Sequence, residues 1–502
     1  MNPLSRRGFL RVGVGGALLT GAVPPPGAAG APAGSVPVEP GSDGTDPVEL
    51  AREMIRFDTS HTGSGGITVP FADMLRAKFA AAGVPTETIP TPKPDNVHLV
   101  ARVSGSGAAG PLLLMAHSDV VTVERANWTH DPYGGDLADG WLHGRGAVDM
   151  KGAGAAFMAA LLRHVREGAR FDRDIVYLAD TDEEGGPYGA RWLVDNHYDK
   201  VAAEVAITEG GWQLARHDGV TPLLASLSLR DRASVLARLT ATGTATHSSH
   251  PDDTPAIAVL SRALDALSTH HVPVVLPPLV RDYFAELARA TENRSLQAAI
   301  RRMLGAPDQP ARDRAAAEVV RHSDYPWIHN SLLRTTFSFV GQQAGYYSSI
   351  VPSTATAEVR IGFVPDGEDP AVRIDAVRRL VAEDGVTLTL SGQPGQTDDD
   401  VLAGLRRNLA RPASRTDTDV YAAWRAAVES VYPGARTVPS QFEASTSAGP
   451  WRDKGVPVYG WYPYVVDGPT VTAMHGNDER VSATALTEGT EAVYRLLAAF
   501  RR

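Results

Sequence analysis

Two histidines and four carboxylates occupy positions where a metal-dependent hydrolase would carry its chemistry. The predicted metal ligands, each expected close to the end of a strand, are His117, Asp149, Glu184, Glu209 and His475. Two imidazoles and three carboxylates, one of them able to bridge, suit two zinc ions that share a ligand. Such a pair of ions activates one water molecule and polarises one carbonyl group. Glu183, beside a predicted ligand, is the spare carboxylate that would take the proton of the water, so the pattern predicts a hydrolase.

Each of these motifs also has an ordinary explanation when it is considered alone. His117 and Asp119 would point the same way on a strand, so Asp119 could hold the imidazole through its other nitrogen, but such a pair is also common as a surface hydrogen bond. Asp149 can be a helix cap, and Glu183 with Glu184 can be a solvated acidic turn. The ordered set, rather than any single member, therefore predicts the metal site.

Strands and helices alternate along the segment that contains these residues. The runs "PLLLMAHSDVV", "DIVYLAD" and "EVAITEG" are typical of buried parallel strands, because their apolar residues are nearly continuous. Residues 150–167 predict a helix with one apolar face. This alternation predicts an α/β layered sheet, in which ligands collect at the carboxyl ends of the strands.

The segment 230–391 interrupts this pattern and contains no predicted metal ligand, although His475 lies beyond it. The sequence therefore predicts a second domain over 230–391, inserted into a discontinuous catalytic domain formed by 47–229 and 392–502.

The first residues resemble an export signal. "SRRGFLR" at residues 5–11 precedes an apolar, glycine-rich stretch and a run of small residues near Ala33. We expect a twin-arginine signal peptide over 1–33 and a flexible linker over 34–46, with the twin-arginine export machinery as a partner. The protein would then be extracellular, periplasmic or associated with the cell wall. A short membrane anchor is the alternative, but the apolar stretch is short for a bilayer span.

Composition narrows the chemistry further. The chain has 502 residues, 43% of them hydrophobic, a formal net charge of −10 and no cysteine. An acidic protein without a basic stripe is not expected to bind nucleic acid. The absence of cysteine excludes a thiol nucleophile and leaves only nitrogen and oxygen atoms as metal ligands.

The stretch "MAHSDVVTVERANWTHDPYGGDLADGWLHGRGAVDMKG" resembles the co-catalytic zinc exopeptidase family that includes aminoacylase, carboxypeptidase S, glutamate carboxypeptidase and succinyl-diaminopimelate desuccinylase. The resemblance runs over roughly residues 47–500. It implies a phosphorylase/hydrolase-like three-layer α/β catalytic domain, with a ferredoxin-like α+β lid and dimerisation domain inserted into it.

The resemblance also implies roles for the predicted ligands. One zinc ion would be held by His117 and Glu209 and the other by Glu184 and His475, with Asp149 bridging both; Co²⁺ and Mn²⁺ are the alternative metals. Glu183 would be the general base and later the acid that protonates the leaving amine, and Asp119 would support a ligand.

The inserted segment supplies two further candidates by the same resemblance. "GTATHSSHPDDTPAIA" makes His247 the expected oxyanion-stabilising residue, supplied by the partner in a homodimer, although a surface histidine is the simpler alternative. Arg360 in "EVRIGFVP" would meet a substrate carboxylate, unless it forms an ordinary ion pair.

Two departures from the family pattern bear on the substrate. Ser349 stands where the family usually has an asparagine. Gly449 in "ASTSAGPWR" stands where the family often has an arginine that binds a terminal carboxylate of the substrate. No backbone group replaces a guanidinium fork, so a free carboxylate on the substrate requires Arg452 or Arg360 to supply the charge.

Together these features predict an exported metal-dependent hydrolase of an N-acyl amino acid, a dipeptide or a peptide C-terminus. A succinyl-diaminopimelate-type desuccinylase, or a non-peptide amidase or carbamate hydrolase on the same scaffold, is the alternative. A serine amidase is disfavoured because neither Gly-x-Ser-x-Gly nor Ser-x-x-Lys occurs. A non-catalytic relative is disfavoured because Glu183 and Asp149 are both present.

Overall fold

A computed structural model of the chain describes residues 45–61, 65–250, 253–382, 384–392 and 395–502. All of the described residues belong to a single compact unit. The expected export signal and nearly all of the expected linker lie outside the described residues. Within those residues, we find no helix with the length and apolar character needed to cross a membrane.

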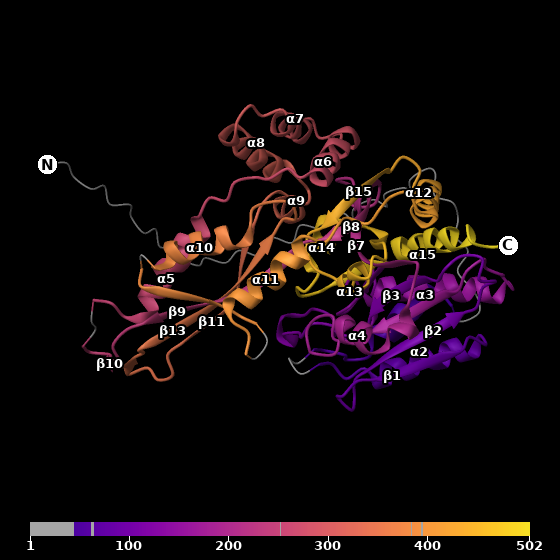
Figure 1. The fold of residues 1–502 in the computed structure, drawn as a ribbon, viewed down its shortest axis with the longest axis horizontal. Coiled ribbons are helices and arrows are strands. Elements are labelled where there is room, and N and C mark those ends of the chain that lie inside the picture. The colour runs from indigo at the N-terminus through magenta and orange to yellow at the C-terminus, as the bar shows by residue number, and fades with distance from the viewer. Residues whose placement is uncertain (1–44, 62–64, 251–252, 383, 393–394) are drawn as a thin grey trace, which may run out of the picture. The chain divides into compact units, whose positions relative to one another are not determined.

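An eight-stranded sheet forms the larger layer of the structure (Figure 1). Its strands, in spatial order, are β1 (Thr86–Pro90), β2 (Val97–Val103), β6 (Ile175–Asp180), β3 (Leu112–His117), β7 (Val205–Ala215), β16 (Val458–Val466), β8 (Pro222–Asp231) and β15 (Arg436–Phe442). The central strands β6, β3, β7 and β16 run parallel, whereas β2 is antiparallel to β6 and β8 is antiparallel to β7. The carboxyl ends of the four central strands therefore meet at one edge.

Helices cover both faces of this sheet. One face carries α1 (Pro47–Ile55), α2 (Val69–Ala81), α3 (Lys151–Arg166), α12 (Asp419–Val431) and α15 (Ala483–Ala498), and the other carries α4 (Ala190–Val201) and α13 (Gly449–Asp453). Strand β3 shows why its sequence is continuously apolar: Leu112 and Leu114 join the core of the first face, while Leu113 and Met115 join the core of the second. The expected three-layer α/β arrangement is confirmed.

A second, four-stranded antiparallel sheet has the order β11–β13–β9–β14. Its strands and helices are β9 (Ala233–Thr242), α5 (Ala256–Thr269), β11 (Thr336–Ala344), β13 (Thr354–Phe363), α10 (Pro370–Ala382), β14 (Val386–Leu390) and α11 (Asp398–Leu409). The chain order β9–α5–β11–β13–α10–β14, with this pairing, is the ferredoxin-like arrangement that was expected. Every second residue of β9, such as Ala237 and Leu239, enters a hydrophobic cluster separate from that of the large sheet.

Four helices lie in the chain between α5 and β11. They are α6 (Pro278–Ala290), α7 (Arg294–Leu304), α8 (Gln309–His322) and α9 (Pro326–Leu333). Helix α6 packs on β8 and β15 of the large sheet, α7 packs on α6, and α8 packs on α7 and α9. Phe284 and Leu333 belong to the core of the large sheet, and the Tyr325 hydroxyl donates to the backbone carbonyls of Ala215 at 2.8 Å and Val466 at 2.9 Å. The segment 230–391 thus contributes to two hydrophobic cores, and its role as a lid and dimerisation domain stays a prediction.

The remaining elements are small. They are η1 (Arg125–Asn127), the strands β4 (Asp136–Ala138), β5 (Trp141–His143) and β17 (Arg480–Ser482) of a three-stranded sheet, the pair β10 (Thr246–His247) and β12 (Ile350–Val351), and α14 (Gly468–Ala473).

Candidate metal centre

The five predicted ligands converge at the carboxyl edge of the large sheet. His117 is the last residue of β3, Glu184 follows β6, and Glu209 lies in β7. Asp149 directly precedes Met150, the N-cap of α3, and His475 follows α14. Because β3, β6 and β7 are parallel neighbours, residues that are far apart in sequence come together here.

Asp149 lies at the centre of the cluster. Its Oδ1 is 3.0 Å from Nε2 of His117, and its Oδ2 is 3.0 Å from Nε2 of His475. Nε2 of His117 also lies 3.5 Å from Oε2 of Glu209, and Nε2 of His475 lies 3.0 Å from Oε1 of Glu184. One carboxylate thus joins two histidine–glutamate pairs, which is the geometry required of a bridging ligand.

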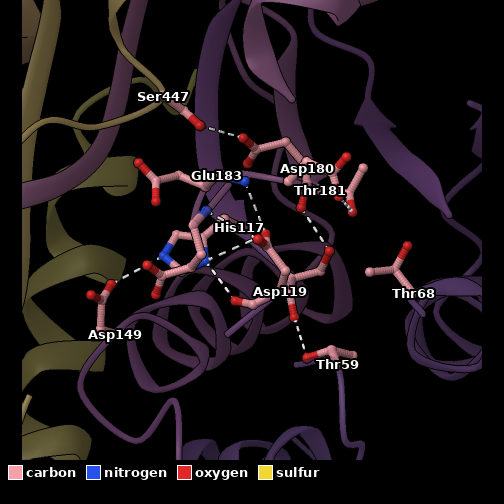
Figure 2. Close-up of polar contacts among 12 residues, drawn as sticks. Thr59, Thr68, His117, Asp119, Asp149, Asp180, Thr181, Glu183 and Ser447 are labelled. Carbon is pink, nitrogen blue, oxygen red and sulfur yellow. Dashed lines mark hydrogen bonds and ion pairs between the residues drawn. The ribbon is translucent and has the colours of Figure 1, made fainter. Parts of the chain in front are cut away.

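Asp119 supports the ligands, but not through the expected contact between its carboxylate and His117 (Figure 2). The Nδ1 of His117 is 2.8 Å from the backbone carbonyl oxygen of Asp119, whereas the Asp119 carboxylate is 3.9 Å from this nitrogen. That carboxylate instead accepts the backbone N–H groups of Glu183 at 3.1 Å and Glu184 at 3.0 Å. The main chain of Asp119 therefore orients the imidazole, and its side chain fixes the turn that carries the predicted base.

The electrostatics of the cluster are those of acids crowded in a buried site. Burial, reinforced by the charge of Glu209, raises the pKa of Glu183 well above its usual range. Burial and the neighbouring Asp149 raise the pKa of Glu209 in the same way. Asp149 is buried too, but hydrogen bonds from His117 and His475 keep its pKa well below its usual range. The site can hold its negative charges together only when protons or metal cations offset them.

The donor set suits divalent cations. His117, Asp149 and Glu184 place ligand atoms within 4.8 Å of one another, and so do His117, Glu183 and Glu209. Imidazole and carboxylate donors fit zinc, and they also fit cobalt or manganese. The second of these groups contains Glu183, which is predicted to be the base. Its carboxylate therefore lies within reach of a metal ion as well as of a reacting water.

Two supporting residues were missed at the sequence level. The Tyr462 hydroxyl, from β16, lies 3.1 Å from Oδ1 of Asp149 and 2.9 Å from Oε2 of Glu209. Oε1 of Glu479 accepts the backbone N–H of Asp149 at 3.1 Å, while its Oε2 pairs with the buried Arg145. Neither residue belongs to a local motif. Tyr462 has the sequence surroundings of an ordinary buried strand position. For Glu479, the one available signal was its closeness in sequence to the predicted ligand His475.

A cavity of about 480 Å³ opens over the cluster and is lined by Asp149, Glu183, Glu443 and Arg360, among other residues. Arg360 is exposed, and its Nη1 donates to Oγ of Ser234 at 3.3 Å. Arg360 is therefore placed where a substrate contact is feasible.

Two other predicted residues lie outside this cavity. The Arg452 guanidinium is buried in an ion pair with Asp231 at 2.7 Å and a hydrogen bond to the Val458 carbonyl at 3.0 Å. The substrate-binding role predicted for Arg452 is thus not supported, because its charge is already compensated inside the protein. His247 is exposed on β10, where its Nδ1 contacts Oγ of Ser249 at 2.8 Å. It does not line the cavity within this chain.

Comparisons with known proteins show what the sequence is similar to. A family model described as "Peptidase family M20/M25/M40" matches residues 113–499. A succinyl-diaminopimelate desuccinylase of Cereibacter sphaeroides is 32% identical over 238 residues, which cover 45% of this chain and 57% of the relative. The chain thus spans little more than half the length of this curated relative.

Solved structures share the fold over a longer range. An M20 family metallo-carboxypeptidase from Sulfolobus solfataricus matches with a TM-score of 0.62 and 16% identity, over 91% of this chain and 99% of that protein. Human carnosine dipeptidase 1 matches with a TM-score of 0.63 and 16% identity, over 90% of this chain and 95% of that protein.

Replacing Tyr462 by phenylalanine should weaken metal binding by about 10- to 100-fold, because the ligands Asp149 and Glu209 lose a hydrogen-bonding neighbour that orients them. Titration with Zn²⁺ against a competing chelator measures the effect. The matched control is Tyr432→Phe, which removes a buried hydroxyl that contacts the Pro463 carbonyl instead. Unchanged affinity in Tyr462→Phe would show that the hydroxyl does not position the ligands.

Proposed function

Because the chain belongs to the peptidase family M20/M25/M40, we propose that it is a metal-dependent hydrolase that cleaves an amide or peptide bond of a small substrate. The main support for this proposal is the position of Asp149. Each of its two carboxylate oxygens contacts one histidine, and the neighbouring turn places Glu183 at the cavity. The proposed substrates are an N-acyl amino acid, a dipeptide or a peptide C-terminus.

The residues divide into metal ligands and a proton carrier. His117 and Glu209 would hold one divalent ion, Glu184 and His475 the other, and Asp149 would be shared. When bound, two such ions acidify a water molecule and polarise the carbonyl of the substrate. Zinc is the proposed metal, with cobalt and manganese as alternatives.

Glu183 would move the proton. Its backbone N–H is held by Asp119, so its carboxylate is presented to the cavity from a fixed turn. Glu183 would take the proton of the water as a carboxylate and return it to the leaving amine as the carboxylic acid, and burial, which raises its pKa, makes the carboxylate a stronger base than that of a solvated glutamate.

A desuccinylase is the second candidate within the same chemistry. Its support is the name of the curated relatives, which are succinyl-diaminopimelate desuccinylases. A carbamate hydrolase or other non-peptide amidase on this scaffold is the third. All of these candidates use the same bond-breaking residues, so the metal centre does not separate them.

Replacing Glu183 by glutamine should lower kcat by roughly 10²- to 10⁴-fold on a hydrolysed N-acyl amino acid or dipeptide, since the proton carrier is lost. The amount of bound metal should change little, and a chelator should abolish the wild-type activity until Zn²⁺, Co²⁺ or Mn²⁺ is added back. Glu429→Gln, an exposed carboxylate of α12, is the control. Turnover that survives in Glu183→Gln would refute the assignment of the base.

We also propose that His247 acts in the site of a partner copy within a homodimer. The support is that His247 is exposed and lies outside the cavity of its own chain. Sedimentation should then show a dimer, and mixing inactive Glu183→Gln with inactive His247→Ala chains should restore part of the activity. A monomer that is fully active would rule this out.

Export by the twin-arginine route, with cleavage near Ala33, remains a further proposal that rests on the N-terminal sequence. N-terminal sequencing of protein recovered outside the cytoplasm of a producing bacterium should begin after the signal. Replacing both Arg6 and Arg7 by lysine should keep the protein in the cytoplasm. Continued export of that variant would contradict the twin-arginine route.

A further inference from the structure

The turn between β6 and α4, residues 181–189, carries both Glu183 and Glu184. Within it, Asp182 has φ 59°, a left-handed conformation that is unfavourable for a residue with a Cβ atom. Such a conformation persists only where surrounding contacts fix it. The contacts between this turn and the rest of the protein therefore decide where the predicted base points.

Two side chains from the region of β2 reach the turn, although β2 carries no residue of the metal centre. Strand β2 is antiparallel to β6, and Leu99 lies opposite Ala179 in their register. Residues that precede Leu99 therefore lie beside residues that follow Ala179. Asn96, immediately before β2, and His98 are two positions apart, so their side chains point to the same side of the strand, and both are fully buried.

The amide of Asn96 holds the beginning of the turn. Its Nδ2 lies 2.8 Å from Oγ1 of Thr181 and 2.8 Å from Oδ1 of Asp182. Because a carboxylate only accepts hydrogen bonds, the amide must present its NH₂ group here. The other oxygen of Asp182, Oδ2, accepts the backbone N–H of Tyr188 at 3.2 Å. The left-handed residue is thus tied to the β2 side chain and to the far end of its own turn.

The imidazole of His98 joins the two ends of the turn. Its Nδ1 accepts the backbone N–H of Thr181 at 3.3 Å, and its Nε2 lies 2.9 Å from the backbone carbonyl oxygen of Tyr188. Since one nitrogen must accept and the other must donate, the arrangement requires a neutral ring that carries its proton on Nε2. Burial lowers the pKa of His98 to about 3, which keeps the ring neutral at physiological pH. The ring also stacks on Trp192 of α4.

We propose that Asn96 and His98 are positioning residues, which hold both ends of the turn so that Glu183 is presented to the metal centre in a reactive orientation. This inference rests on the proposed function and extends it to residues outside the site. Neither side chain lines the cavity over the metal centre, so the effect of each on the reaction passes through the turn. Asp119 holds the middle of the same turn, through the backbone N–H groups of Glu183 and Glu184.

The main test is His98→Phe, which fills the space of the ring and keeps an aromatic face on Trp192, but removes both hydrogen bonds. With saturating Zn²⁺, kcat should fall by about 10- to 100-fold on an N-acyl amino acid or dipeptide that the wild type hydrolyses, because small displacements of a catalytic group have effects of this size. KM should change little, since no group that lines the cavity is altered.

A second variant, Asn96→Asp, reaches the same end by a nearly isosteric change. It places a carboxylate against that of Asp182, so a hydrogen bond is replaced by repulsion between like charges. The loss in kcat should be similar to that of His98→Phe. This variant also tests the proposal if His98→Phe fails to fold.

The matched control is His164→Phe. His164 is also buried, and burial lowers its pKa to about 4; its Nε2 lies 2.9 Å from the carbonyl oxygen of Tyr494, on which its ring stacks. It lies roughly 20 Å along α3 from Lys151, at the end of the helix remote from the ligands. This control should lower the melting temperature, because a buried carbonyl loses its partner, yet leave kcat unchanged. An equal loss of kcat in His98→Phe and His164→Phe would overturn the positioning role.

Hydrogen–deuterium exchange examines the turn without turnover and so separates this inference from the proposed function. In metal-loaded wild type, the two N–H groups that the Asp119 carboxylate accepts should exchange slowly. Both β2 variants should speed exchange in peptides that cover 181–189 by roughly tenfold or more, and His164→Phe should not. Unchanged exchange in both β2 variants would overturn the inference. If metal-loaded wild type hydrolyses none of the tested amides, the proposed function fails, while the exchange rates still decide whether Asn96 and His98 hold the turn.

Discussion

The crowding of acidic side chains in a buried site is the constraint on which this structure depends. Asp149, Glu183, Glu184 and Glu209 all line one cavity, and like charges at this separation in a poorly solvated site repel strongly. Two histidines relieve part of the repulsion through their contacts with Asp149. A pair of divalent cations would relieve more of it, which is why the same residues that are costly to bury make a coherent metal centre.

The rest of the protein holds these acids in place with backbone groups and buried partners. Asp119 accepts two backbone N–H groups of the turn after β6, and Glu479 does the same for the backbone around Asp149 while paired with Arg145. Each anchor is itself a buried carboxylate that is satisfied by hydrogen bonds. Mobility of the ligands is thereby limited before any metal binds.

The sheet makes this arrangement possible because its central strands are packed on both faces. At the edge that carries the ligands, β7 and β16 approach closely: Gly210 has φ 143°, and a Cβ atom there would lie 2.9 Å from the Cα of Gly460. Only glycine at this position allows Glu209 and Tyr462 to face the same cluster from adjoining strands. The pair of glycines after Glu209 is thus explained by strand packing as well as by the site.

The sequence by itself determined the apolar strands, the layered α/β sheet and the identity of the residues that gather at the carboxyl edge. These features depend on local periodicity and on the order of ligand types, which a single chain displays directly, whereas the ferredoxin-like second sheet was expected only from the resemblance to a known family. The tertiary structure alone decided which part of Asp119 holds His117, that Arg452 pairs with Asp231, that α6 packs on the large sheet, and that Tyr462 reaches the ligands. Each of these depends on contacts between residues whose relative positions only the folded backbone defines, because the free energy of a buried charge or hydroxyl is set by the partner it meets and not by its neighbours in sequence.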